Sequence, residues 1–151
     1  MALNLPPEIA AYLAQHHVMT LATQGSDGPW AAAVFFAGDD DDLVFLSSPT
    51  SRHCRNLALD ARCAATIQSE TEDWLGIQGI QLEGRVSELH GEERARAQQR
   101  YGEKFPFARP DSAAAAIVRA LARVRWYRLR MARLYFIDNA RGFGHREQFE
   151  A

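Results

Sequence analysis

The sequence has few of the features that mark secreted or membrane proteins. Its 151 residues include only two cysteines, Cys54 and Cys63, whose spacing forms neither a CxxC motif nor a disulfide framework. No apolar run approaches the roughly 18 residues of a membrane span, and the first residues lack a basic stretch followed by an apolar one. We therefore expect a soluble, cytoplasmic protein with two reduced thiols.

The chain also has little net charge. It carries 17 basic and 19 acidic side chains, a formal charge of −2 and a pI near 6.2. Dedicated nucleic-acid binders usually show a strong basic excess, so neither a nucleic acid nor a membrane is expected as a partner. The arginines between residues 119 and 133 are expected to form a solvated face or to pair with Glu70, Glu72 and Asp73. The length suits one domain over residues 1–151.

Hydrophobic periodicity predicts short strands with helices between them. Strands are predicted at residues 18–23, 30–37, 43–46, 63–69, 77–89, 127–131 and 134–137. Helices are predicted at residues 7–16, 49–61, 92–103 and 112–123, the last anchored by Ile117, Leu121 and Val124. Polar turns are predicted at residues 25–29 and 39–42, and a β-bulge at Ala132 and Arg133.

The longest predicted strand, residues 77–89, places Ile80, Leu82 and Val86 on one face and polar side chains on the other. This is the period of a half-buried antiparallel strand, in which Gly84 would allow a sharp bend. Tight turns, not helices, join the first three strands, which excludes a parallel doubly wound sheet. We predict a mainly β, α+β fold: a small antiparallel barrel of six or seven strands with peripheral helices.

Residues 45–53, FLSSPTSRH, carry the most distinctive chemistry. Ser48 followed by Pro49 predicts an N-cap with proline at the first helical position. The first turn would then hold hydroxyls, Arg52 and His53 but no acidic residue, although a helix N-terminus favours negative charge. Free N–H groups, hydroxyls and a guanidinium at this place would form a phosphate cradle. The alternative is a plain capping serine with the arginine in solvent.

This segment resembles the Tyr/Phe-Thr-Asn-x-x-Ser-Arg-Lys segment of the pyridoxamine 5′-phosphate oxidase-like flavoproteins. The likeness continues in Leu21-Ala22-Thr23, in Gly28-Pro29 and in the strand from Gln78 to Gly84, which ends in Glu-Gly. It covers about residues 18–89 and is weaker over residues 127–144. The resemblance implies a Greek-key split β-barrel that forms a homodimer and binds FMN at the dimer interface.

The resemblance also implies roles for individual residues. The FMN phosphate would be held by Ser47, Ser51, Arg52 and His53. The backbone of Ala32, Ala33 and Val34 would pass the flavin ring, and Gln81 would reach a ring carbonyl. The expected activity is an FMN-dependent oxidoreductase acting on a small-molecule substrate. The flavin would supply the chemistry, because no side chain stands out as a catalytic acid or base and no metal site is expected.

Three departures from the family pattern qualify these expectations. His53 replaces a lysine and is charged only in part near neutral pH. Ala31 or a neighbour replaces an arginine, and only Arg146 stands where the family has its pyridoxal phosphate segment, so oxidation of vitamin B6 is not expected. Three alternatives stay open: a flavin binder without catalysis, a haem-binding split barrel that uses His53 or His145, and a structural dimer with a degraded flavin site.

Overall fold

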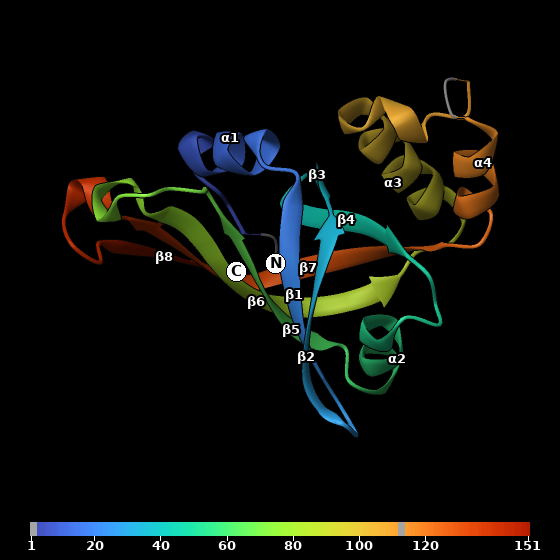
Figure 1. Ribbon diagram of the computed structural model, residues 1–151, viewed down its shortest axis with the longest axis horizontal. Helices are drawn as coiled ribbons and strands as arrows, with labels where there is room; N and C mark the ends of the chain where they lie inside the picture. Colours follow the sequence, from blue (N-terminus) through green and yellow to red (C-terminus); the bar gives the residue numbers. More distant parts are fainter. Residues whose placement is uncertain (1–2, 112–113) are drawn as a thin grey trace.

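A curled antiparallel sheet dominates the structure, a computed structural model that describes residues 3–111 and 114–151 (Figure 1). The strands are β1 (Val18–Gly25), β2 (Gly28–Phe35), β3 (Ala37–Asp39), β4 (Asp42–Ser47), β5 (Arg62–Gln68), β6 (Gln78–Glu88), β7 (Arg125–Asp138) and β8 (Arg146–Glu150). They follow the order β2-β1-β5-β6-β7-β4-β3, and β8 pairs with β7. The predicted α+β split barrel is confirmed, with eight strands instead of six or seven.

Helices surround this sheet (Figure 1). They are α1 (Pro7–Gln15), α2 (Arg52–Leu59), α3 (Gly91–Lys104) and α4 (Ala115–Leu121), with short 3-10 helices η1 (Trp74–Gly76), η2 (Pro106–Ala108) and η3 (Asn139–Arg141). The four predicted helices are present with shifted ends. Ser112 and Ala113, where the last was predicted to begin, lie outside the described residues. None of the helices described is long and apolar enough to cross a membrane.

The inner face of the sheet is apolar because its strands alternate inward and outward side chains. Every second residue of β5 is buried, and β6 alternates in the predicted way from Ile80 to Ser87. These side chains form the main core with α1 and α2. A second, smaller core lies between α3, β4 and β7 and consists of Ala37, Val44, Leu89, Ala97, Tyr101, Phe105 and Trp126.

Strand β7 holds the sheet together because it pairs with β6 along its length, with β4 over its first half and with β8 over its second half. The register with β6 shifts between Glu83 and Gly84, which leaves Ala132 as the extra residue and confirms the predicted bulge. A Cβ atom at Gly84 would lie 2.1 Å from the carbonyl oxygen of Arg130. Glycine is therefore required where the two backbones approach most closely.

Two expectations for the C-terminal third are wrong. No strand is predicted after residue 137, yet β8 follows a turn in which Gly142 and Gly144 have positive φ. The alternating positions of β8 are only half-buried, so its hydrophobic pattern is weak. The predicted anchors of the last helix are half-buried at most, and α4 buries no residue among those described, because it contacts η2 instead of a face of the sheet.

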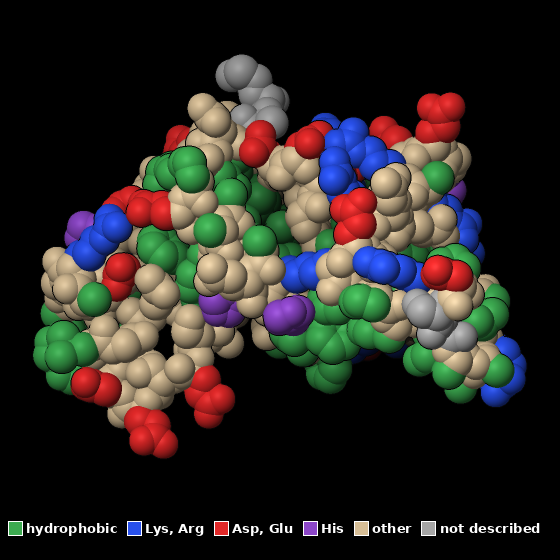
Figure 2. All heavy atoms as spheres, turned by 90° about the horizontal axis from the view of Figure 1, so that it is seen from above, with side chains coloured by type: hydrophobic (Ala, Val, Ile, Leu, Met, Phe, Trp, Pro, Cys, Tyr) green, Lys and Arg blue, Asp and Glu red, His purple; other side chains and the backbone are tan. Residues whose placement is uncertain are grey.

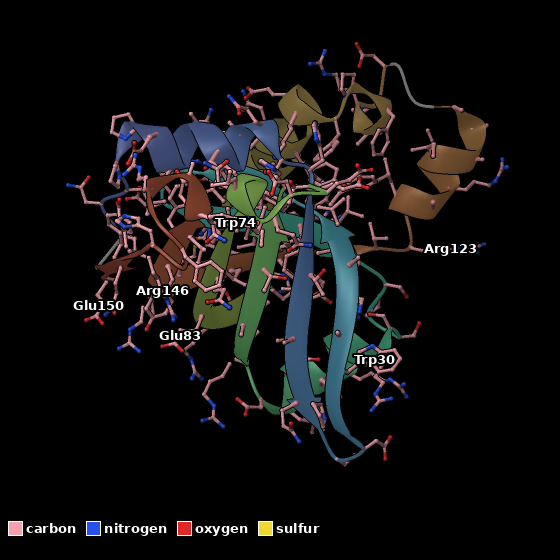
Figure 3. The ribbon with its side chains drawn as sticks, turned by 60° about the vertical axis from the view of Figure 1, so that its left-hand side comes forward. Trp30, Trp74, Glu83, Arg123, Arg146 and Glu150 are labelled. Atoms are coloured by element: carbon pink, nitrogen blue, oxygen red, sulfur yellow. The ribbon has the colours of Figure 1, made fainter. Side chains whose placement is uncertain are left out.

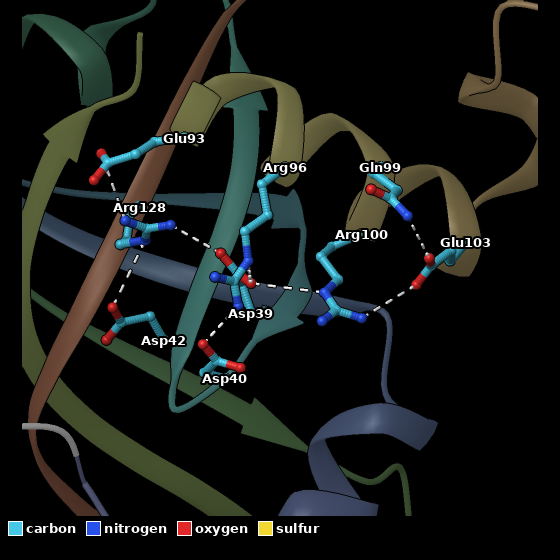
Figure 4. A network of polar contacts seen from close by, with 9 residues as sticks. All are labelled: Asp39, Asp40, Asp42, Glu93, Arg96, Gln99, Arg100, Glu103 and Arg128. Carbon is cyan, nitrogen blue, oxygen red and sulfur yellow. Dashed lines mark hydrogen bonds and ion pairs between the residues drawn. The ribbon is translucent and has the colours of Figure 1, made fainter. Parts of the chain in front are cut away.

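The sequence predicts a solvated turn between β3 and β4, but Asp39 in this turn is buried beneath three arginines (Figure 4). One Asp39 oxygen lies 2.8 Å from Arg96 Nε and 3.7 Å from Arg100 Nε, and the other accepts a hydrogen bond of 2.8 Å from Arg128. Arg128 also lies 3.7 Å from Asp42. Asp39 thereby joins the β3–β4 hairpin to α3 and β7.

The same contacts correct the expected partners of the C-terminal arginines. Among the described residues, the ion pairs of this group join Arg125 to Glu88, Arg128 to Asp39, Asp42 and Glu93, Arg130 to Asp42, and Arg133 to Glu83 and Glu150. Glu70, Glu72 and Asp73 take no part in them. The strand pairing decides this outcome: β7 lies beside β4, β6 and β8, and not beside the loop that carries those three acidic residues.

Replacing Asp39 by Asn should lower the free energy of unfolding by about 3 kcal/mol, because it leaves the half-buried Arg128 guanidinium without its main counter-charge. Asp40→Asn is the matched control, since the Asp40 side chain is 74% exposed against 2% for Asp39, while both contact Arg96. That control should cost less than about 1 kcal/mol. Urea unfolding followed by tryptophan fluorescence measures both values, and equal losses would show that Asp39 does not join these elements.

Candidate functional site

The candidate site is built where β4 ends and α2 begins. Helix α2 starts at Arg52 with Ser51 as its N-cap, and the Ser51 hydroxyl oxygen accepts a hydrogen bond of 3.4 Å from the Cys54 N–H. The prediction that Ser48 is the N-cap is therefore wrong. Pro49 occupies a turn closed by the Ser51 N–H and the Ser48 carbonyl at 3.1 Å. The fixed φ of proline suits the second position of such a turn as well as the first position of a helix.

Three of the four residues predicted to hold a phosphate converge at this place. The hydroxyl oxygen of Ser47, the last residue of β4, lies 2.8 Å from Nε2 of His53. The Ser51 hydroxyl oxygen lies 3.4 Å from the same nitrogen. We call Ser47, Ser51 and His53 the hydroxyl–imidazole cluster. Ser47 is buried, and the other two side chains are half-buried.

The charge of this cluster depends on His53. Burial lowers the pKa of His53 below its usual value of 6.5, because desolvation disfavours the charged ring. The cluster is thus uncharged at neutral pH, whereas a lysine would carry a full positive charge. The N–H groups of Arg52 and His53, in the first turn of α2, have no partner within the helix and remain available to an anion.

The fourth predicted phosphate ligand, Arg52, points toward the β1–β2 hairpin. Its Nη2 donates a hydrogen bond of 3.3 Å to the carbonyl oxygen of Asp27. Its guanidinium carbon lies 4.2 Å from the centre of the Trp30 ring, which is labelled in Figure 3. Arg52 is half-buried, so the alternative prediction of an arginine that points into solvent is wrong. Within the part of the chain described, no carboxylate forms an ion pair with it.

Trp30 and Asp27 are the two contacts of the site that the sequence did not suggest. Both belong to the β1–β2 hairpin, and they lie 22 and 25 positions before Arg52 in the chain. No local pattern relates a residue of a hairpin tip to a residue of the next helix. The only available signal was an aromatic residue, Trp30, beside the predicted turn.

The remaining predicted residues line the sheet. The side chains of Ala32 and Val34 turn toward the core, whereas Ala33 is exposed on the outer face. Ala33 pairs with Thr20, Thr20 with Thr66, and Thr66 with Gln81, so Gln81 lies in the same cross-strand row. Three strand spacings separate Gln81 from Ala33, roughly 14 Å. The structure thus places these residues on one sheet, apart from the hydroxyl–imidazole cluster, and their role in binding stays a prediction.

A shallow hollow of about 580 Å³ lies on this outer face, over β1, β5 and β6. Its floor consists of small residues, Ala22, Ala64, Gly84 and Ala132, and charged side chains at its edge include Arg62 and Arg85. Arg62 is held by Asp60, whose pKa it lowers to about 2 through hydrogen bonds. The small floor leaves the sheet backbone open to a flat group or to another protein surface.

The histidines considered as haem ligands lie in different places. His53 is part of the hydroxyl–imidazole cluster, and His145 precedes β8, where its Nε2 lies 3.3 Å from a Glu147 oxygen. No group of three or more metal-binding side chains is found among residues 3–111 and 114–151. Both cysteines are free and buried, and burial raises the pKa of Cys63 to about 12. Neither thiol is poised to act as a ligand or nucleophile.

Two curated proteins are similar to this chain over most of its length. The chain is 32% identical over 138 residues to a UPF0306 protein from Klebsiella pneumoniae, covering 90% of this chain and 86% of the relative. It is 31% identical over the same length to the UPF0306 protein YhbP from Escherichia coli, with the same coverage.

Solved structures with the same fold include a protein described as heme binding and one described as a heme storage protein. A heme binding protein from Mycobacterium smegmatis superposes with a TM-score of 0.73 at 25% identity, covering 97% of this chain and 59% of that protein. The heme storage protein HutZ from Vibrio cholerae superposes with a TM-score of 0.67 at 18% identity, covering 87% of this chain and 91% of that one. The second likeness concerns the fold alone.

The family model for pyridoxamine 5′-phosphate oxidase matches residues 5–137, which include all eight residues predicted to bind the cofactor. The chain therefore belongs to the pyridoxamine 5′-phosphate oxidase family.

Proposed function

We propose that this protein is a cytoplasmic, homodimeric flavoprotein that binds FMN by its phosphate and acts as an oxidoreductase on a small substrate. The observation that carries the proposal is the convergence of the Ser47 and Ser51 hydroxyls on His53 Nε2, at 2.8 and 3.4 Å, at the start of α2. A helix N-terminus with free N–H groups and hydroxyls is suited to a phosphate. No acidic side chain of the first turn opposes an anion there.

The residues present fit the phosphate group of FMN. The Ser47 hydroxyl would donate a hydrogen bond to its oxygens, and the Ser51 hydroxyl would do so after leaving the Ser48 carbonyl, to which it now donates at 2.7 Å. The first N–H groups of α2 would add two more hydrogen bonds. Arg52 would supply the positive charge after leaving the Asp27 carbonyl and the Trp30 ring. An exposed cation–π contact is worth about 0.5–1 kcal/mol. The bond to the Asp27 carbonyl and a bond to the phosphate are both hydrogen bonds to a charged group, worth roughly 1.5–3 kcal/mol each, so the exchange would favour the phosphate through the added attraction between opposite charges.

When bound, the flavin would supply hydride or electron transfer, and the protein would orient and shield it. No side chain at the start of α2 is placed as a proton donor or acceptor beyond His53. Bleaching of bound FMN by reduced nicotinamide cofactors, followed by reoxidation with an added acceptor, tests the proposed oxidoreductase activity. Bound FMN that is never reduced would favour the flavin binder without catalysis.

We further propose that two copies pack through the outer face of the sheet. The outward side chains of β1, β2 and β5 are unusually small at Ala22, Ala31, Ala33, Ala64 and Thr66. Small side chains leave the backbone of this face open to close approach by a second copy. A second copy over this face would also enclose the hollow above Ala22 and Ala64.

Haem is the second candidate ligand, favoured by the heme-binding descriptions of two structures with this fold. An axial ligand would come from His53 or His145. Addition of haem would then give a Soret band that is lost in His53→Ala or in His145→Ala. A haem spectrum that neither variant changes, in a protein that does not bind FMN, would contradict both assignments.

Arg52→Ala should weaken FMN binding about tenfold or more, because it removes one charge-assisted hydrogen bond. Arg55→Ala, an exposed arginine on the same helix, is the matched control and should leave the dissociation constant nearly unchanged. Titration followed by flavin fluorescence measures both variants. Riboflavin, which lacks the phosphate, should bind wild type and Arg52→Ala equally. An unchanged affinity for FMN in Arg52→Ala would show that Arg52 is not the anchor.

FMN affinity should rise as the pH falls from 8 to 6. Burial keeps His53 neutral in the free protein, and a nearby phosphate would raise its pKa, so binding would take up a proton. His53→Gln should lose this rise. Its FMN affinity should instead fall as the pH falls, because the phosphate group, whose second pKa is near 6, loses part of its negative charge. His53→Lys should bind FMN at pH 8 at least tenfold more tightly than wild type. Parallel pH profiles for wild type and His53→Gln would refute the role of His53.

A further inference from the structure

One end of the molecule presents an apolar cluster with acidic surroundings. Trp74, Leu75, Ile77 and Phe143 are between 44% and 85% exposed, and the rings of Trp74 and Phe143 lie 5.9 Å apart. We call these four residues the tryptophan cluster. Residues 69–77 carry three acidic side chains, those of Glu70, Glu72 and Asp73, and no basic one.

This cluster is held in place by hydrogen bonds. The buried Asn139 donates from Nδ2 to the carbonyl oxygen of Trp74 at 3.0 Å, and its Oδ1 accepts from the Gly144 N–H at 3.0 Å. The Asn139 N–H donates to the Ile77 carbonyl, also at 3.0 Å. Asp73 caps η1 by accepting a hydrogen bond from the Leu75 N–H. These hydrogen bonds hold large apolar side chains in contact with solvent, which is unfavourable in free energy. A role in binding would explain why they are exposed.

The other end of the molecule presents the opposite charge. Helix α4 contains Ile117, Val118 and Leu121, yet buries no residue among those described, and Val118 is 48% exposed. Residues 114–125 carry Arg119, Arg123 and Arg125 and no acidic side chain. Among the described residues, Arg119 and Arg123 form no ion pair, and neither do Glu70, Glu72 and Asp73.

The two surfaces lie at opposite ends of the chain. In Figure 1 η1 and η3 flank the left end of the sheet and α4 stands at the right end, and Figure 3 labels Trp74 and Arg123 on opposite sides. Along the lower edge of Figure 2, hydrophobic and acidic side chains gather at the left, and hydrophobic and basic ones at the right. Both surfaces are therefore open on the same side of the molecule.

We propose that α4 of one copy docks on the tryptophan cluster of a second copy, and that the second copy returns the same contact. The proposal rests on the homodimer proposed above and names the contacts that hold it at its two ends. A two-fold axis that brings α4 of one copy to the tryptophan cluster of the other also brings α4 of the other copy to the tryptophan cluster of the first. The dimer therefore contains this contact twice. Val118 and Ile117 would pack on Trp74 and Leu75, with Arg119 and Arg123 facing Glu70 and Glu72.

The opposite charges favour a second copy as the partner. Arg141 and Arg146 flank Phe143, but Arg141 pairs with Glu8, Asp138 and Glu147, and Arg146 lies over the Tyr135 ring. The charges that form no ion pair among the described residues are acidic at Glu70, Glu72 and Asp73 and basic at Arg119 and Arg123, so this chain itself carries a complementary surface. Complementary charges guide two such surfaces into register, whereas two identical ends would repel each other. A head-to-tail arrangement that did not close would form filaments, but two contacts related by a two-fold axis close at the dimer.

Two charge-reversed variants test the proposal. The first is Arg119→Glu with Arg123→Glu, and the second is Glu70→Arg with Glu72→Arg. All four side chains are exposed, so the fold should not depend on them. In a dimer of either variant, both contacts become repulsive. In a mixed dimer of the two variants, both contacts become attractive again. Arg55→Glu with Arg94→Glu changes the net charge as the first variant does and serves as the control.

Each variant alone should dimerise at least tenfold more weakly than wild type in 50 mM NaCl, with a smaller difference in 0.5 M NaCl because salt screens exposed charges. The control should behave as wild type. An equimolar mixture of the two variants should recover dimers of mixed mass, detected by native mass spectrometry, with close to wild-type affinity by light scattering.

The proposal is overturned if each variant dimerises as well as wild type, or if the mixture forms no more dimer than its parts. A wild-type protein that stays monomeric at all concentrations would overturn it together with the proposed homodimer. None of these outcomes depends on FMN, since the measurements follow mass alone. Failure of the end contacts and failure of cofactor binding are therefore distinguishable.

Discussion

The pairing of β7 determines where the neighbouring strands β4, β6 and β8 lie and where the turn into α2 begins. This strand bonds to β6 along its length and to β4 and β8 over its two halves, and the bulge at Ala132 lets it bend as it does so. The bend is possible because Gly84 presents no Cβ to the Arg130 carbonyl. Ser47 pairs with Arg125 at the start of β7, so the strand also determines where β4 stops and where the turn into α2 begins.

The site that results differs in its electrostatics from the family pattern. A lysine would hold a permanent charge where His53 sits half-buried and neutral, and the nearby arginine rests on Trp30 and Asp27. In the proposed function, such a site would bind an anion through hydroxyls, N–H groups and a guanidinium that leaves its present contacts, with proton uptake by the imidazole. Its affinity should be lower than that of a site with a fixed cation, and more sensitive to pH.

The sequence predicted the helices and strands of the barrel better than the residues at which they begin and end, and better than the contacts between distant segments. Alternation in β6 and the bulge at Ala132 were visible because both are local patterns. The start of α2 was misplaced because Pro49 suits a turn as well as a helix, and only the hydrogen bond to Ser51 distinguishes them. Asp39 looked like one of four aspartates in a turn, and only the packing of α3 against the hairpin makes it a buried counter-charge. The resemblance to the family identified the cluster of Ser47, Ser51 and His53, but not that Arg52 rests on Trp30.

The central claim is that the start of α2 recognises a phosphate. The most direct test compares FMN with riboflavin on the unmodified protein at pH 6, by titration of flavin fluorescence, because the two ligands differ only in that group. The account predicts that FMN binds at least tenfold more tightly than riboflavin. Equal affinities, or no binding of either flavin, would contradict it.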